Sequence, residues 1–259
     1  MTLSYSSVLN KKHYLPDGTE LDVGHTQSDT VGVSASYAPA DRWLLVAGLP
    51  LVQTKFHGAG AHGPAVDHGH NNVFVTDLRL ELRYQAVDYP VALAPFVAAV
   101  IPTNNYPVLG HAAPGRGLNE YWVGFFAGKT LEDWLPGAYV QMRYSYSFVE
   151  KVVGIRHDRS NLDAEIGYFF SPEWSVQAVG AWQWAHGGID VPVPAASPLF
   201  PYHDQLAAAG FLNVTGGLAW FPTERHSVSL NYTQSLRGSN AHKVDRGISV
   251  AFGYRPRPR

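Results

Sequence analysis

The sequence contains no cysteine and few charged residues. Without cysteine the chain can form neither a disulfide framework nor a thiolate metal site. Asp, Glu, Lys and Arg make up 15% of its 259 residues, and aromatic residues make up 13%. About a quarter of a soluble protein is charged, so this composition suits an apolar surrounding. The formal net charge of −2 offers no basic surface, and we expect no nucleic-acid partner.

Long apolar runs are absent as well. The longest uncharged apolar stretch, Tyr89 to Thr103, falls short of the roughly twenty residues of a membrane helix, and three prolines interrupt it. The opening segment MTLSYSS has no basic stretch followed by an apolar run, so we expect that a signal peptide has been removed. No composition shift or linker divides the chain, which predicts one domain over residues 1–259.

What the chain does have is alternation of polar and apolar residues over segments of about ten to fourteen residues. The segment VFVTDLRLELRY places acidic and basic residues opposite leucines, and YVQMRYSYSF, LDAEIGY, WSVQAVGAWQW, SVSLNYTQSL and GISVAFGY repeat the pattern. Period two indicates β-strands, and strands of soluble proteins average only about five or six residues. A tilted strand needs about ten residues to cross a bilayer.

The links between these segments alternate in length. Short links are predicted at Ala38 to Arg42, Val87 to Pro90, Glu132 to Gly137, Ser171 to Glu173 and Pro222 to Arg225. Long links are predicted at Asn10 to His25, His57 to Asn72, Asn104 to Gly117, Lys151 to Ser160 and Gly187 to Gln205. Short periplasmic turns and long extracellular loops are typical of outer-membrane barrels.

Aromatic residues gather beside the short links, as in an interfacial girdle at the lipid headgroups. They are Tyr37, Trp43, Tyr84, Tyr89, Trp134, Tyr168, Trp174, Trp220, Phe221 and Tyr254. Together these features predict an all-β fold, a closed antiparallel up-and-down transmembrane β-barrel of about twelve strands with both termini at the short-turn end. A soluble barrel or sandwich is the alternative. Alternation fades around Pro50 and Pro95, where we expect bulges.

The stretch TDLRLELRYQ, a short turn and then VALAPFVAAVIPTNNY resemble bacterial outer-membrane proteins of the phenol meta-pathway degradation-like transporter family. The resemblance covers the barrel pattern over most of the chain, and its specific motifs are few. It implies passage of small, often hydrophobic or aromatic compounds across the outer membrane of a Gram-negative bacterium, and it carries over no catalytic residue. Barrels of this family usually finish on an aromatic residue, whereas here RPRPR follows Tyr254.

Charged residues in the middle of predicted strands must face the barrel lumen, because a cation at the bilayer midplane costs roughly 2 to 4 kcal/mol. The predicted lumen-lining residues are Asp77, Arg79, Glu81, Arg83, Arg143, Asp163 and Glu165. They form either a polar ladder of both signs along a solute path or a neutralised filling of a narrow barrel.

Two long links carry further candidate residues. The link FHGAGAHGPAVDHGHNN holds His57, His62, His68 and His70, whose imidazoles could bind zinc, copper or nickel, with Asp67 beside them. The link GIDVPVPAASPLFPYHDQL is long, proline-rich and apolar. We expect its Leu199, Phe200 and Tyr202 to form a constriction inside the barrel or a surface for a protein partner; a plain surface loop is the alternative.

These features predict an outer-membrane channel that passes small solutes passively, with lipid and the solute as its partners. The sequence holds no nucleotide-binding motif, so no cofactor is expected. A scaffold barrel within a cell-envelope complex is the alternative. A lipid-modifying enzyme is a third hypothesis, but its one Ser/His grouping, His226, Ser227 and Ser229, lies at a predicted short turn with no orienting acid.

Overall fold

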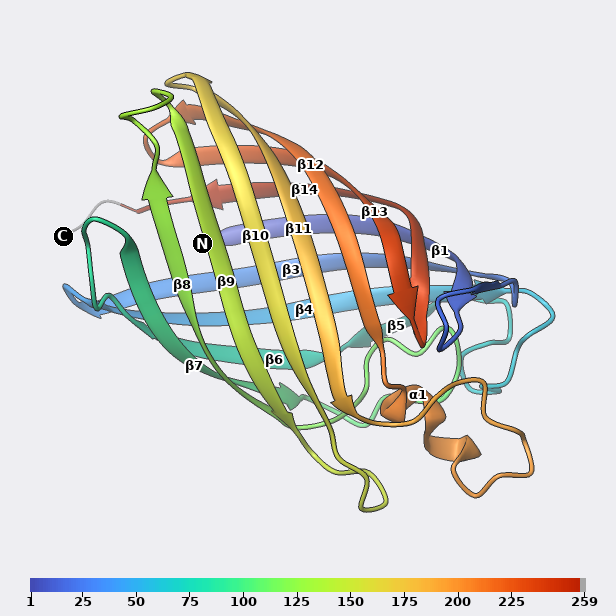
Figure 1. Ribbon diagram of the computed structural model, residues 1–259. Helices are drawn as coiled ribbons and strands as arrows, with labels where there is room; N and C mark the ends of the chain where they lie inside the picture. Colours follow the sequence, from blue (N-terminus) through green and yellow to red (C-terminus); the bar gives the residue numbers. More distant parts are fainter. Residues whose placement is uncertain (257–259) are drawn as a thin grey trace.

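The computed structural model describes residues 1–256, and one antiparallel sheet closed on itself dominates it (Figure 1). The strands of the wall are β1 (Thr2–Tyr14), β3 (His25–Ala40), β4 (Trp43–His57), β6 (Asp77–Tyr84), β7 (Ala92–Pro102), β8 (Glu120–Thr130), β9 (Ala138–Val149), β10 (His157–Ser171), β11 (Trp174–Gly187), β12 (Gly210–Thr223), β13 (His226–Ser239) and β14 (Ala241–Tyr254). Wall strands adjacent in sequence pair with each other, and β14 pairs with β1 to complete the ring. Within the described residues this is the predicted up-and-down barrel of twelve strands.

Two short strands accompany the wall. β2 (Glu20–Leu21) pairs with the end of β1, and β5 (Asn72–Val75) continues the line of β6 along β4. β5 and β6 are offset by an extra residue opposite Pro50, where the Thr76 amide donates to the Pro50 carbonyl at 3.2 Å. The expected bulge near Pro50 is therefore present.

The bulge expected near Pro95 is present on the β6 side of β7. The register between β7 and β8 is continuous from Ala92 to Val100. On the other side, the pairing of β6 with β7 runs to Arg83 opposite Phe96 and resumes at Val87 opposite Leu93, so residues 84–86 face residues 94–95. The amides of Ala86 and Val87 both donate to the Leu93 carbonyl, at 2.9 and 3.2 Å, as in a β-bulge.

Both chain ends lie at one end of the barrel, where the Met1 amino group donates to the Tyr254 carbonyl at 2.8 Å (Figure 1). We call this the turn end, because its links are short: 41–42, 85–91, 131–137, 172–173 and 224–225. The opposite end, the loop end, carries the links 15–24, 58–71, 103–119, 150–156 and 188–209. The strict alternation of link length is wrong at two places. The loop-end link 150–156 is no longer than 85–91 and 131–137 at the turn end, and at the loop end β13 is joined to β14 by Asn240 alone. Its φ of 50° lies in the left-handed region, which asparagine tolerates.

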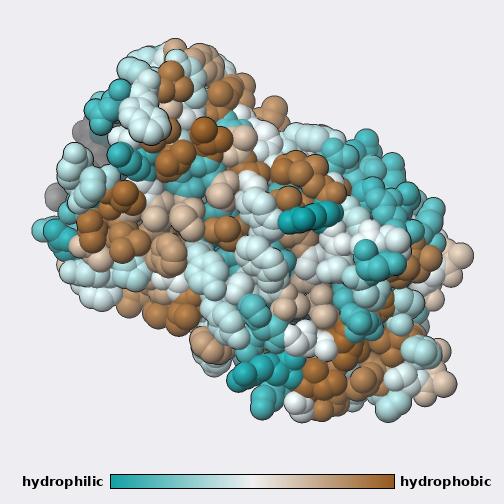
Figure 2. Space-filling model, in the orientation of Figure 1, coloured by the Kyte–Doolittle hydropathy of each residue, from teal (hydrophilic) through white to brown (hydrophobic). Residues whose placement is uncertain are grey.

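Apolar side chains cover the outside of the wall, and polar ones line the inside. Exposed side chains recur at alternate positions of the strands, among them Leu80, Val97, Val123, Ile166, Leu218, Leu230 and Val250. Glu81, Ser145, Ser147 and Ser175, on the other face of their strands, are buried. Hydrophobic residues accordingly spread over the barrel surface (Figure 2). All the aromatic residues predicted for the girdle are exposed except Phe221, and Trp174 stacks on Trp220 across two strands.

Three long links, 58–71, 103–119 and 188–209, fold over the loop end. The link 188–209 contains a 3-10 turn, η1 (Phe200–Tyr202), and a short helix, α1 (His203–Leu206), and lies beside the barrel mouth (Figure 1). Leu206 is fully buried among Leu118, Val149 and Val152. Among the described residues no helix is long and apolar enough to cross a membrane.

Candidate functional site

A cluster of charged residues occupies one side of the barrel interior. The buried Glu81 carboxylate on β6 forms ion pairs with Arg79 and Arg83 of its own strand. It also lies 3.5 Å from Arg143 on β9. Because β7 and β8 separate β6 from β9 in the sheet, these two side chains can only meet across the concave face. The contact therefore places this cluster inside the barrel.

Aromatic rings from the intervening strands pack under the guanidinium groups. Arg79 lies 4.8 Å from the centre of the Trp122 ring, and Arg83 lies 4.1 Å from Phe126. Arg143 lies 4.7 Å from Phe96. Cations over ring faces are held by cation–π attraction, which strengthens where water is excluded. We call this assembly the charged wall: Arg79, Glu81, Arg83, Phe96, Trp122, Phe126 and Arg143.

The other charges predicted for the lumen lie around this wall. Asp163 on β10 is 3.8 Å from Arg143, and its side chain is 45% exposed. Glu165 accepts hydrogen bonds from Tyr139 at 2.6 Å and Gln141 at 2.9 Å. Asp77 accepts one from Tyr106 of the link 103–119. The structure thus brings Arg79, Glu81, Arg83, Arg143 and Asp163 together, and holds Asp77 and Glu165 in separate contacts.

Part of the interior face of β11 to β14 is built from smaller, uncharged residues. Gln177 donates to Asn231 at 3.0 Å, and Asn231 donates to Ser249 at 3.3 Å. The first of these bonds passes over Gly217, where a Cβ atom would lie 2.2 Å from the Asn231 oxygen. A hydroxyl pair, Thr215 and Thr233, adds a 2.8 Å contact. We call Gln177, Thr215, Gly217, Asn231, Thr233 and Ser249 the small-residue wall.

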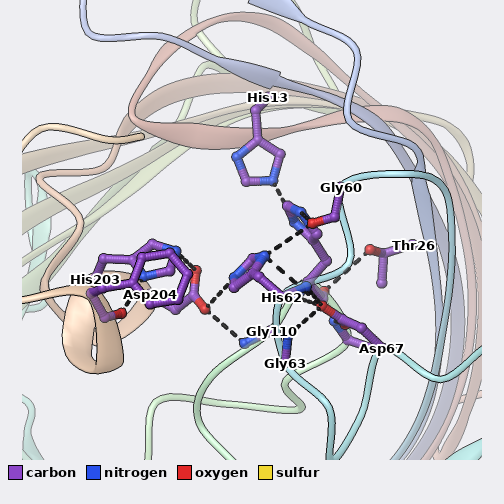
Figure 3. Close-up of polar contacts among 12 residues, drawn as sticks. His13, Thr26, Gly60, His62, Gly63, Asp67, Gly110, His203 and Asp204 are labelled. Atoms are coloured by element: carbon purple, nitrogen blue, oxygen red, sulfur yellow. Dashed lines mark hydrogen bonds and ion pairs between the residues drawn. The ribbon is translucent and has the colours of Figure 1, made fainter. Parts of the chain in front are cut away.

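A cavity of about 590 Å³ lies between the barrel interior and the loops that fold over the loop end. The buried Asp67 carboxylate fixes its rim, because it accepts the amides of Gly63, His111 and Ala112 at 2.9 to 3.1 Å (Figure 3). Asp67 therefore ties the link 58–71 to the link 103–119. Charge-assisted bonds of this kind are among the stronger hydrogen bonds in proteins.

The four histidines predicted as metal ligands do not meet. His57 packs beside His25, with ring centres 5.3 Å apart, and the His68 and His70 rings face each other at 5.5 Å. His62 alone borders the cavity, where its Nε2 lies 3.0 Å from the Asp204 carboxylate (Figure 3).

Two groups of side chains could hold a metal ion instead. His62, His203 and Asp204 form one, and His13, His111 and His242 form the other; the candidate ligand atoms of each group lie within 4.8 Å of one another. Of these six residues, only His62 belongs to the histidine-rich link that the sequence analysis singled out, because the other five come from distant segments. A usable signal did exist for one pair: His13 and His242 stand near the loop ends of the first and last strands, which ring closure places side by side.

Electrostatics differ between the loop residues of these groups. Burial alone would lower the pKa of His62, but its hydrogen bond to Asp204 and the nearby carboxylates raise the pKa above its ordinary value. Burial would raise the pKa of Asp204, yet the His62 hydrogen bond, His203 and the Gly110 amide lower it to about 2. Burial, helped by the neighbouring His62, lowers the pKa of His111. The carboxylates thus favour the charged form of His62, whereas burial favours the neutral form of His111.

Of the residues predicted to form a constriction, Phe200 and Tyr202 belong to η1 and Leu199 directly precedes it. Phe200 lines the cavity, with its ring 4.9 Å from that of His203. Tyr202 is exposed, and Leu199 is not among the residues that line the cavity. The buried anchors of this link are His203, Gln205 and Leu206.

At the turn end, His226 contacts the Thr223 hydroxyl at 2.8 Å, next to Ser227 and Ser229 in sequence.

No protein-family model matches the chain, and no curated protein sequence does. Solved structures share its fold. An outer membrane channel from Pseudomonas putida F1 is 15% identical with a TM-score of 0.72, and the match covers 98% of this chain and 93% of that one. The NanC porin is 10% identical with a TM-score of 0.55, covering 98% and 100%.

The translocator domain of the autotransporter NalP from Neisseria meningitidis is 11% identical with a TM-score of 0.54, covering 98% and 88%. At these identities the likeness shows the fold alone. The chain therefore has the fold of outer-membrane β-barrels, and a channel, a porin and a translocator share it.

Proposed function

We propose that this chain is a bacterial outer-membrane channel that passes small solutes passively. The observation that carries this proposal is the unequal interior of the barrel. Bulky Arg, Trp and Phe side chains project from β6 to β9, whereas the small-residue wall on β11 to β14 presents a glycine and short amide and hydroxyl side chains. Small residues on one side leave room that a uniformly filled barrel would not have.

The outside of the barrel supports the membrane part of the proposal. Leu80, Ile166 and Val250 are 44%, 56% and 41% exposed, and they belong to a surface of exposed apolar side chains that continues around the wall. A soluble monomer rarely carries such a large apolar surface. Lipid is the partner that satisfies it, and the exposed aromatic residues at the turn end suit a headgroup interface.

The charged wall supports a solute preference. Arg79, Arg83 and Arg143 share the Glu81 carboxylate, and Arg143 also faces Asp163. Three cations against two anions leave positive charge in excess on this side of the interior. At the loop end, Phe200 and Phe211 line the cavity. We therefore propose small solutes that combine an apolar or aromatic part with a negative charge. This agrees with what the family resemblance implies about aromatic compounds.

Conductance in planar lipid bilayers tests the proposal. The purified chain is expected to give small, discrete steps, because the charged wall narrows the interior. A variant that lacks residues 192–199, which leaves the anchors His203 and Leu206 in place, is expected to give equal or larger steps. Absence of conductance from both proteins, with folding shown by a gel-mobility change on heating, would contradict the channel and support the scaffold alternative.

A further inference from the structure

Three imidazoles meet at the seam where the barrel closes. His13 on β1 and His242 on β14 are directly opposite in the register, with ring centres 3.9 Å apart. His111 comes down from the link 103–119, and its ring centre lies 4.8 Å from that of His13. All three line the loop-end cavity. Three elements far apart in the sequence thus supply one side chain of the same kind to one place.

The backbone fixes which nitrogen of His111 faces this cluster. Its Nε2 lies 3.1 Å from the Gly60 carbonyl, which can only accept, so Nε2 carries the proton. In a neutral ring Nδ1 then carries a lone pair, which accepts a hydrogen bond from Nε2 of His13 at 3.1 Å (Figure 3). A metal ion between the two nitrogens would replace that shared proton. Metal-binding histidines characteristically donate their other N–H to a carbonyl or carboxylate in this way.

The neighbouring group, His62, His203 and Asp204, is engaged differently. Both ring nitrogens of His62 face acceptors, the Gly60 carbonyl at 3.1 Å and the Asp204 carboxylate at 3.0 Å. His203 likewise contacts the Phe200 carbonyl at 2.6 Å and Asp204 at 3.3 Å. These contacts occupy the ring nitrogens of both histidines and join α1 to the link 58–71. The Asp204 charge also acts on the other three histidines and would offset part of a cation's charge there.

We propose that His13, His111 and His242 form a binding site for one divalent transition-metal ion of the zinc, nickel or copper type. Imidazole suits these ions, whereas calcium and magnesium require oxygen ligands. The ligand atoms lie within 4.8 Å of one another. A tetrahedral zinc ion with bonds of about 2.0 to 2.1 Å needs its nitrogens about 3.3 Å apart, so small ring rotations close the site. The cavity leaves the fourth position open to water or a solute.

Zinc titration of the untagged full-length chain in detergent tests this site. The wild type is expected to bind one Zn²⁺ per chain. Replacing His242 with alanine is expected to weaken binding by more than about 100-fold, because loss of even an outer partner of a ligand costs 10- to 100-fold. The double variant His68→Ala with His70→Ala removes two imidazoles from the same end of the barrel and is expected to bind like the wild type.

Copper provides a readout that does not depend on affinity. The nitrogen hyperfine pattern of bound Cu²⁺ is expected to indicate three imidazoles in the wild type and two in His242→Ala. Zinc is also expected to raise the unfolding temperature of the wild type and not that of His242→Ala.

Three results would overturn the proposal. One is absence of saturable zinc binding by the folded wild type. Another is binding unchanged in His242→Ala but lost in Asp204→Asn, which would assign the metal to the neighbouring group. The third is binding lost in the His68 and His70 double variant. If His242→Ala fails to fold, His111→Gln, on a loop outside the wall, gives the same comparison.

Discussion

The two walls of the barrel interior hold their polar side chains in opposite ways. On β6 to β9, a buried carboxylate is surrounded by three guanidinium groups that lie against aromatic rings. On β11 to β14, uncharged groups bond to each other over a glycine, as Gln177, Asn231 and Ser249 do. Both walls hold their polar groups away from lipid. Only the first fills space and carries charge.

The two walls therefore differ in how firmly their side chains are held and in how much space they leave for a solute. Removing one partner of a buried ion pair is costly, because it leaves the other charge buried without a counter-charge. The charged wall therefore has one strongly preferred arrangement. Short neutral side chains hold little charge and little volume, and substitutions there change the shape of the free space more than the stability of the fold. We therefore propose that the solute path runs along the small-residue wall and that the charged wall selects among solutes.

The largest expected effect is on the charged wall. Glu81→Gln leaves Arg79, Arg83 and Arg143 without their shared carboxylate, and breaking a buried pair in this way typically costs about 3 to 5 kcal/mol. Urea unfolding in lipid vesicles measures the change. The exposed Glu224→Gln at the turn end is the control and is expected to stay within about 0.5 kcal/mol of the wild type. Equal stability of the two variants would contradict a preorganised charged wall.

A second prediction concerns volume on the small-residue wall. Ser249→Trp places a large ring beside Asn231 inside the barrel and is expected to reduce single-channel conductance severalfold. Ile248→Trp, on the same strand but exposed on the outside, adds the same ring and is expected to leave conductance unchanged. If the outward substitution has the larger effect, the path does not run along this wall.

A third prediction separates charge from volume. Arg143→Glu reverses a charge that contacts both Glu81 and Asp163, and it is expected to move ion selectivity severalfold from anions toward cations. Reversal potentials under a salt gradient measure the shift. Arg42→Glu, at the exposed turn end beside Asp88, is the control and should leave the reversal potential unchanged. A shift caused equally by both variants would mean that charge at the entrance, not the charged wall, sets selectivity.

The smallest effect is expected for Asn231→Ala. This variant removes the hydrogen bonds to Gln177 and Ser249, but both partners remain next to polar neighbours, so we expect a loss of about 1 kcal/mol. Chemical unfolding beside Glu81→Gln gives the comparison. A loss as large as that of Glu81→Gln would show that the small-residue wall is as tightly organised as the charged one.

Most of the wall could be predicted from the sequence, because a strand with lipid on one side must alternate. The period-two pattern of Asp77 to Tyr84 placed its charges on one face, and Leu80 is exposed on the other. Local pattern failed where pairing depends on partners. The strand pattern did not show where β13 ends and β14 begins, because Asn240 alone joins them within the stretch RGSNAHK.

The loop-end site was much less predictable. Four histidines close together in sequence suggested one cluster, but only His62 turns toward the cavity. The cluster that forms takes His13 and His242 from the two ends of the chain, and His111 from a link held in place by Asp67. Such a site follows from ring closure and loop packing, which composition and spacing do not encode locally.

Cysteine scanning tests most directly whether the small-residue wall borders a water-filled path, and the absence of native cysteine leaves no background. Ser249→Cys and Ile248→Cys are to be treated in lipid vesicles with a charged, membrane-impermeant thiol reagent, and conductance recorded before and after. Reaction of Ser249→Cys, with a fall in its conductance and no reaction of Ile248→Cys, is the predicted result. Reaction of Ile248→Cys alone, or of Ser249→Cys with unchanged conductance, would contradict the account.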